Sequence, residues 1–431
     1  MKTKKIFSYL FLIILLIILE LGLLTGICAI PKKYIQENVQ TSAEFLCEKA
    51  PFFHLLKNDT ASRIDRYADA ILMNIAWSCD CEHPLQSALC SAYYQNDAHN
   101  ENTNLLFAVT QDAPPTYEYM RYWHGSLVVL RPLLIFFSVR EIYILCAAIL
   151  FVLLGISAYS IYRNYGKAVF WCFLCSALVC SVWFVPFSLE YMPTFFIGFA
   201  AIPITIALQK KAPDKSGYLF LTLGSLTAYT DFLTTETLTC LLPLIFVLLA
   251  QKKTDTKPFS LCIKNGAIWF AGYCTTWISK WLLYSAFMKK NGLSDALTQT
   301  AYRTGGEVVP DGLFAQIFGA FLRNLRCLFP FSLIKDPGGT VTSAIVLVII
   351  GMLFFLVKKQ KNMPSIVSAL WMIGILPYLR YAVLSNHSFI HYFFTYRAQF
   401  VSVFCLFLIF AYGTDTDFLK KEWKKINGVS R

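Results

Sequence analysis

The chain has 431 residues, of which 56% are hydrophobic and only 15% are charged, whereas an ordinary soluble domain has about 25% charged residues. The apolar residues form long unbroken runs and do not alternate with polar residues at period two. This composition excludes a soluble globular enzyme, a disordered chain and an outer-membrane barrel. The net charge of +12 comes with short Lys and Arg runs that follow apolar segments, as in cytoplasmic loops, so we expect no nucleic-acid partner. The sequence predicts an all-α polytopic membrane protein.

The amino-terminal segment 1–30 is predicted to be an uncleaved signal anchor. Lys2, Lys4 and Lys5 precede an apolar run that continues to the end of this segment. A cleaved secretory signal has an apolar region of about 7–15 residues followed by small residues. This run is about twice as long, and Pro31 directly after it makes a poor cleavage site. We therefore expect the amino terminus to lie in the cytoplasm.

Ten segments are apolar enough to predict helices that cross a membrane, for which about 20 residues are needed. They are 6–30, 141–162, 167–187, 192–209, 217–230, 236–250, 265–288, 341–357, 364–384 and 392–412. The segments 217–230 and 236–250 are short, so these helices are expected to be tilted, broken or only partly spanning. Two further apolar segments, 126–139 and 311–334, are interrupted by Arg and Pro, which predicts interfacial or re-entrant helices.

The distribution of Lys and Arg predicts which turns face the cytoplasm, where membrane proteins concentrate basic residues. The turns that contain Lys or Arg are 163–167, 210–215, 252–264 and 358–361. The turns that contain neither are 187–191, 231–235 and 385–391. We therefore predict a multi-pass protein of the plasma membrane, with both termini in the cytoplasm and the second group of turns outside.

This topology divides the chain into six regions, two of which are long outer segments. The predicted regions are the anchor at 1–30, an extracytoplasmic helical domain at 31–125, a transmembrane core at 126–288 with its interfacial segment 126–139, an outer loop with an interfacial helix at 289–340, C-terminal transmembrane helices at 341–412, and a cytoplasmic tail at 413–431. Within the helical domain, Asn58, Asp59 and Thr60 are expected to cap a helix that begins near Ala61. Residues 93–119 are polar and contain proline, which predicts a loop.

Four cysteines lie in the predicted outer domain: Cys47, Cys79, Cys81 and Cys90. Outside the cytoplasm they can form one or two disulfides, and four cysteines allow three pairings among which the sequence does not choose. The spacing of Cys79 and Cys81 is not that of a zinc site. We therefore predict no dedicated metal site.

The uncommon charged groups gather on the side that is predicted to face outward. They are Glu37, Asp65, Asp69, His124, Glu190, Asp231, Glu236, Arg303, Glu307, His387, His391 and Arg397. Ionisable groups at or within a membrane boundary are rare and energetically costly. These residues are therefore candidates for binding or catalysis.

Asp65 and Asp69 are the first candidate pair. On a helix, residues four apart share one face, where two carboxylates can hold a proton, a divalent cation or a sugar hydroxyl. The alternative is a solvated helix face on which Arg63 and Arg66 are ion-pair partners.

Asp231 and Glu236 form a second pair, in a turn between two short apolar helices. There they can face a substrate site, or Asp231 can cap the following helix.

His387, His391 and Arg397 form the third candidate group, which can bind phosphate or a phosphosugar. The alternative is an aromatic belt with an arginine that reaches the surface. Trp123 and His124 are the fourth group, either stacking on a sugar ring or anchoring the membrane interface. Two charges inside predicted spans, Glu20 and Lys280, are expected either to pair with each other or, for Lys280, to face a lipid phosphate.

This layout of an anchor helix, an acidic outer domain and helix hairpins that return acids and bases to one face resembles the GT-C superfamily of membrane glycosyltransferases. The resemblance implies transfer of a sugar from a polyprenyl-phosphate donor to a cell-surface glycan or lipid acceptor. It implies Asp65 or Asp69 as the general base, and Arg397 with His387 or His391 as the groups that stabilise the departing phosphate. Asp231 and Glu236 would orient sugar hydroxyls or hold a divalent cation. A divalent cation is the one cofactor that this hypothesis includes.

Two other classes of function remain open. One is a transporter or flippase for a lipid-linked or polar substrate, and the other is a non-catalytic protein of cell-envelope assembly. A transporter usually has polar residues through the membrane midplane and a repeated half, whereas here the polar residues favour the outer side. Walker, Rossmann, nucleophile-elbow and zinc-protease motifs are absent from the sequence. The sequence thus favours a glycosyltransferase whose acids and bases converge in one outward pocket.

Overall fold

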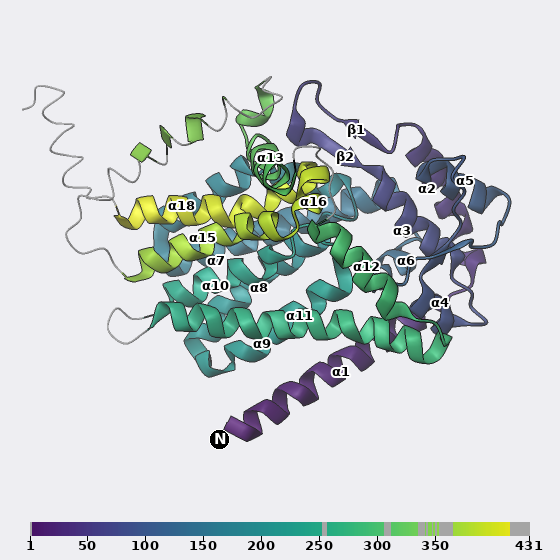
Figure 1. The fold of residues 1–431 in the computed structure, drawn as a ribbon, viewed down its shortest axis with the longest axis horizontal. Coiled ribbons are helices and arrows are strands. Elements are labelled where there is room, and N and C mark those ends of the chain that lie inside the picture. The colour runs from purple at the N-terminus through teal and green to yellow at the C-terminus, as the bar shows by residue number, and fades with distance from the viewer. Residues whose placement is uncertain are drawn as a thin grey trace, which may run out of the picture.

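The computed structural model describes residues 2–251, 257–305, 312–334 and 365–413, together with parts of 341–352. The described residues are mainly helical, which confirms the predicted class. Figure 1 shows a bundle of long helices and, at one end of it, a smaller group of short helices with two small antiparallel sheets. This smaller group is formed by residues 31–125, the segment that the sequence predicts to lie outside the cytoplasm, and it is named the outer domain for that prediction.

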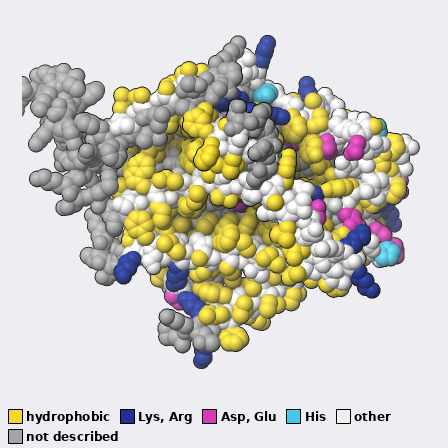
Figure 2. All heavy atoms as spheres, viewed as in Figure 1, with side chains coloured by type: hydrophobic (Ala, Val, Ile, Leu, Met, Phe, Trp, Pro, Cys, Tyr) yellow, Lys and Arg dark blue, Asp and Glu magenta, His cyan; other side chains and the backbone are white. Residues whose placement is uncertain are grey.

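Five helical segments among the described residues are long and apolar enough to cross a membrane. They are Lys4–Cys28, Val139–Val179, Met192–Lys211, Ile366–Val383 and Tyr392–Tyr412. In Figure 2, hydrophobic side chains cover most of the visible bundle surface, while Asp and Glu side chains gather over the smaller region. Such a surface suits a lipid environment. These five segments support the prediction of a helical membrane protein, and the count of ten crossings remains a prediction.

Most long helices begin and end close to the predicted bounds. The bundle helices are α1 (Lys2–Cys28), α7 (Val139–Val179), α8 (Met192–Lys211), α9 (Ser216–Thr230), α10 (Thr237–Leu249), α11 (Pro258–Met288), α15 (Ser365–Val383) and α18 (Phe400–Gly413). Gly166 divides α7 into two helices because it has φ +83° and ψ −177°, a backbone conformation that favours glycine. This break lies in the predicted turn 163–167. The predicted span 341–357 lies largely outside the described residues.

Shorter helices connect the bundle at the end near the outer domain. They are α6 (Leu127–Leu133), α12 (Gly292–Gly305), α13 (Leu313–Leu325), α16 (Ser385–Ile390) and α17 (Tyr392–Thr395). Helices α6 and α13 lie in the segments predicted to be interfacial. The predicted span 392–412 contains a 3₁₀ turn, Tyr396–Gln399, between α17 and α18.

The outer domain is built around α3, which packs against α2 and α5. Its elements are α2 (Gln36–Cys47), β1 (Phe52–His54), β2 (Arg63–Asp65), α3 (Arg66–Ser78), α4 (Pro84–Cys90), β3 (Ala92–Tyr93), α5 (Glu101–Thr110) and β4 (Tyr117–Glu118). Strand β1 pairs with β2, and β3 pairs with β4. The domain thus brings the start of α3 to the side that adjoins the bundle.

The prediction of a helix beginning near Ala61 is wrong. Asp59 accepts a hydrogen bond from the Ala61 amide, but it caps only a single 3₁₀ turn. The chain then extends as β2, because residues 63–65 pair with β1. The true cap of α3 is Asp65, whose carboxylate accepts a hydrogen bond from the Ala68 amide at 2.9 Å. Asp65 and Asp69 therefore do not share a helical face, since Asp65 precedes the helix in an extended conformation.

The prediction of a loop over residues 93–119 is also wrong in part, because this segment contains α5. Asn100 caps the helix by accepting a hydrogen bond from the Thr103 amide. Leu105 and Ala108 are buried in the core. Polar residues dominate the segment, so this narrow apolar face was too weak a signal to predict the helix.

Helices α9 and α11 pack closely through two glycines. A Cβ atom on Gly224 would lie 2.0 Å from the Trp269 carbonyl oxygen, and one on Gly272 would lie 2.3 Å from the Leu221 carbonyl oxygen. Side chains at these positions would push the helices apart, which is how small residues permit tight packing in membrane proteins.

Candidate functional site

A cavity of about 390 Å³ lies where the outer domain meets the bundle. Its polar lining residues are Asp65, Tyr67, Tyr119, Tyr122, His124, Glu190, Arg303, His387 and His391. Four of the nine predicted site residues therefore lie in one hollow: Asp65, His124, His387 and His391. The first and the last of them, Asp65 and His391, are more than 300 positions apart in the sequence. The partial convergence of acids and bases was predictable from the charge pattern alone.

Asp65 and Glu190 form a carboxyl pair in this cavity. Burial raises the pKa of Asp65 to about 7, and hydrogen bonds from the Ala68 amide and the Glu190 side chain oppose that rise. Burial raises the pKa of Glu190 well above its ordinary value, and the neighbouring charge of Asp65 adds to the rise. Two close carboxyl groups cannot both ionise easily. Glu190 therefore holds the proton of the pair, and Asp65 is the group that can accept one near neutral pH.

Asp69 lies behind the cavity and does not line it. Its carboxylate accepts hydrogen bonds from the Tyr143 hydroxyl, from the Ser188 hydroxyl at 3.0 Å and from the Leu189 amide at 2.8 Å. These bonds tie α3 to the loop that carries Glu190. Asp69 is therefore placed to position Glu190 rather than to contact a substrate.

His387 and His391 stand side by side, with ring centroids 4.7 Å apart. The ring of His391 also stacks on that of Phe394, with centroids 5.1 Å apart. Burial lowers the pKa of His387 well below its ordinary value and lowers that of His391 to about 3, and Arg303 acts in the same direction on both. Both imidazoles are therefore neutral at physiological pH and can donate or accept a hydrogen bond.

Several buried polar atoms around the cavity have no hydrogen-bond partner within the described part of the chain. They are Glu190 Oε2, His124 Nε2, His387 Nδ1 and His391 Nδ1. Buried polar atoms in folded proteins are nearly always paired, so a group of unpaired ones at one place points to a polar ligand. This is the strongest indication that the cavity is a binding site.

Arg303, near the end of α12, supplies a positive charge at the cavity wall. The sequence placed it on the outer face but did not single it out as a site residue, because nothing local distinguishes it from a surface arginine. Arg397, which was predicted for this role, is buried elsewhere. Its guanidinium stacks on Tyr191 at 4.6 Å and donates to the Phe393 carbonyl at 3.3 Å. Its two partners are the chain neighbours of Glu190 and Phe394, which line the cavity, but Arg397 itself does not line it.

Asp231 and Glu236 do not line the cavity either. Asp231 accepts hydrogen bonds from the amide and the hydroxyl of Thr234. Glu236 forms a buried ion pair with Arg380, with oxygen to nitrogen distances of 2.8 and 3.2 Å. Arg380 also donates to the Leu233 carbonyl and so joins α15 to this turn. The turn thereby holds Phe232 in the cavity wall.

Trp123 does not line the cavity, and its indole donates to the Thr276 carbonyl at 2.7 Å.

Glu20 and Lys280 do not pair with each other within the described residues. Glu20 accepts a hydrogen bond from Ser225 at 2.8 Å, and Lys280 donates to the Ala88 carbonyl at 2.6 Å. Lys280 is thus paired with the backbone, whereas the second oxygen of Glu20, Oε2, has no hydrogen-bond partner within the described residues.

Two apolar cavities flank the site. One of about 210 Å³ shares Leu72 with it, and another of about 330 Å³ shares Tyr122 and Arg303. Both are lined mainly by hydrophobic side chains of the bundle helices. A ligand with a polar head at Arg303 could therefore extend an apolar chain between helices.

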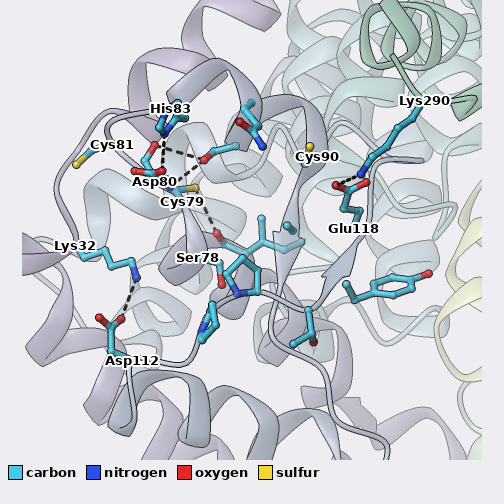
Figure 3. Close-up of a pocket in the computed structure, with 18 residues that line it drawn as sticks. Lys32, Ser78, Cys79, Asp80, Cys81, His83, Cys90, Asp112, Glu118 and Lys290 are labelled. Atoms are coloured by element: carbon cyan, nitrogen blue, oxygen red, sulfur yellow. Dashed lines mark hydrogen bonds and ion pairs between the residues drawn. The ribbon is translucent and has the colours of Figure 1, made fainter. Parts of the chain in front are cut away.

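A larger hollow, of about 1020 Å³, is lined by residues of the outer domain and by Lys290 (Figure 3). Its charged groups are mostly paired with each other. The pairs are Lys32 with Asp112 at 2.9 Å, His83 with Asp80 at 2.9 Å and Lys290 with Glu118 at 2.8 Å. Because these groups satisfy one another, the larger hollow has fewer free polar groups to bind a ligand than the smaller cavity.

No cluster of three metal-ligating side chains occurs in the part of the chain that the structure describes.

The chain matches no protein-family model, and no curated protein or solved structure is significantly similar to it. Function must therefore be argued from the cavity itself.

Proposed function

We propose that the protein is a GT-C-like glycosyltransferase that moves a sugar from polyprenyl phosphate to a glycan or lipid acceptor outside the cytoplasm. The proposal includes the ten-crossing topology with both termini in the cytoplasm. The observation that carries it is the group of unpaired polar atoms around Asp65 and Glu190, in a cavity flanked by apolar cavities. A lipid-linked sugar combines the polar and apolar parts that such a site accommodates.

Asp65 is proposed as the general base. It takes the proton of the acceptor hydroxyl while that oxygen bonds to the anomeric carbon of the donor sugar. The bond between that carbon and the phosphate oxygen breaks, and polyprenyl phosphate leaves as an anion. A base is most effective when its pKa is near the working pH, and the pKa of Asp65 is about 7. The protonated Glu190 keeps a hydrogen bond to Asp65 throughout.

Arg303, His387 and His391 are proposed to bind the phosphate. The guanidinium of arginine matches the geometry of phosphate oxygens. The neutral imidazoles can donate further hydrogen bonds to the phosphate, and they carry no positive charge that would repel Arg303. These donors stabilise negative charge where it develops during the reaction. Since phosphate leaves as a stable anion, no strong general acid is required. The apolar cavity that shares Arg303 supports this proposal, because a prenyl chain bound there would lie beside the phosphate site.

Aromatic side chains are proposed to hold the sugar. Tyr119, Tyr122 and Phe232 line the cavity together, and aromatic faces suit the apolar faces of sugar rings. This role was predicted for Trp123, which packs behind them. Asp231 and Glu236 are not proposed as cation ligands, because Thr234 and Arg380 occupy their carboxylates.

The test compares Asp65→Asn with Asp112→Asn, a matched change in the larger hollow, in full-length protein purified in detergent. Sugar transfer from a labelled polyprenyl-phosphate donor is measured for both. Loss of a general base typically lowers the rate by about 10²–10⁴-fold, and that loss is expected for Asp65→Asn alone. Full activity of Asp65→Asn would remove the assignment. Movement of the intact donor across liposomes without transfer would favour a flippase.

A further inference from the structure

Two cysteine sulfur atoms face each other where the anchor helix meets the outer domain. Cys28 is the last residue of α1, and Cys79 directly follows α3. Their Sγ atoms are 3.3 Å apart, and both side chains are buried. A disulfide has a sulfur to sulfur distance of about 2.05 Å, so a small movement is enough to form the bond.

Contacts on both sides hold these two helix ends together. The guanidinium of Arg131 on α6 donates to the Ile27 carbonyl, next to Cys28. The ammonium of Lys32 lies 5.1 Å from the ring of Trp77 on α3, two residues before Cys79. The approach of the cysteines is therefore fixed by packing and does not depend on the sulfur atoms alone.

The two thiols differ in access and in acidity. Cys79 lines the large hollow of the outer domain, as Figure 3 shows, whereas Cys28 does not. A hydrogen bond from Cys28 lowers the pKa of the Cys79 thiol, and the charges of Arg131 and Lys32 lower it further, against the effect of burial. The thiolate is the reactive form of cysteine. Cys79 is therefore the sulfur that meets an oxidant first.

We propose that Cys28 and Cys79 form a disulfide that joins the anchor helix to the outer domain. The Cys79 thiolate attacks a disulfide carried by an extracytoplasmic thiol oxidant, which gives a mixed disulfide and releases one thiol of the oxidant. Cys28 loses its proton and attacks the Cys79 sulfur, which releases the second thiol. The cysteines are oxidised by two electrons, and the oxidant disulfide is reduced to two thiols.

This pair differs from those expected from the sequence, which counted only Cys47, Cys79, Cys81 and Cys90. Cys28 was assigned to the membrane and so left out. Cys81 and Cys90 line the same hollow as Cys79, but neither forms a sulfur to sulfur contact within the described residues. These two cysteines are therefore suitable controls.

The inference rests on the outer placement of residues 31–125 in the proposed function and not on the transfer chemistry. The test alkylates full-length protein under non-reducing conditions and maps its peptides by mass spectrometry. A linked Cys28–Cys79 peptide is expected in wild type, Cys81→Ser and Cys90→Ser, and its loss in Cys28→Ser and Cys79→Ser. In addition, reductant is expected to lower the melting temperature of wild type but not of Cys28→Ser.

Alkylation of both cysteines in wild type, or linkage of Cys79 to Cys81 or Cys90, would overturn the proposal. The wild-type map decides the question even if a serine variant fails to fold. A linked peptide in a protein without transferase activity would remove the proposed function and leave the disulfide in place.

Discussion

The two polar hollows of this protein differ in a way that size does not reveal. The outer-domain hollow is the larger, at about 1020 Å³, and its charges are satisfied by ion pairs across its walls. The cavity at the bundle has about 390 Å³, and it keeps a carboxyl pair, neutral imidazoles and an arginine close together with several polar atoms unpaired. Groups that satisfy one another stabilise a fold, whereas unsatisfied groups are available to a ligand. The unpaired polar atoms therefore favour the smaller cavity as the binding site.

The largest expected effect on stability concerns the ion pair that supports the cavity. Glu236→Gln leaves Arg380 buried without its charge partner, and breaking a buried pair costs about 3–5 kcal/mol. The matched change Glu118→Gln in the outer-domain hollow breaks an exposed pair, which contributes about 0–1 kcal/mol. Denaturant unfolding of both variants in detergent measures the difference. Equal losses would show that the two regions are not distinguished by their electrostatics.

The next effect concerns the phosphate site. Arg303→Gln removes the positive charge from the cavity wall, and loss of one donor to a developing anion lowers the rate constant by about 10²–10³-fold. Lys290→Gln is the control, because Lys290 belongs to the larger hollow. Transfer kinetics with a polyprenyl-phosphate sugar measure both. If Lys290→Gln is the more damaging change, the site has been assigned to the wrong hollow.

A smaller effect is expected in the pH dependence of stability. The pKa of Asp65 is raised to about 7 by burial, so between about pH 4 and pH 7 the folded protein binds more protons than the unfolded chain. Asp65 therefore contributes to the free energy of unfolding at low pH, and this contribution is lost as the pH rises through 7. Asn at position 65 stays neutral, so Asp65→Asn avoids the cost of ionising a buried carboxyl group at neutral pH. The variant is therefore expected to have a higher melting temperature than wild type at neutral pH and a lower activity.

The control for this effect is Asp112→Asn, a matched change outside the cavity, whose melting temperature is measured over the same pH range. An Asp65→Asn variant that is less stable than wild type at pH 8 would contradict the prediction. It would then be a structural residue whose carboxylate is needed for the fold.

The helical class and most long helices were predictable because a membrane-spanning helix is a long local pattern of apolar residues. The start of α3 was not, since Asp59 and Asp65 are both good cap residues. Pairing of β2 with β1, which no local pattern encodes, decided between them. Helix α5 was missed because its apolar face is narrow.

The candidate site was predictable only in part. The charge pattern assigned Asp65, His387 and His391 to the same predicted side, because it predicts which turns face outward. It could not tell a residue that lines a cavity from one directly behind it, which is the difference between Arg303 and Arg397. That difference depends on side-chain direction and tertiary packing.

The most direct test is labelling with a polyprenyl-phosphate analogue that carries a photoreactive group beside the phosphate. We expect full-length protein to be labelled in peptides that contain Arg303 or residues 387–394, and excess unlabelled donor to suppress the labelling. Labelling of residues 78–92 or 112–118 in the larger hollow, or labelling that the donor does not suppress, would contradict it.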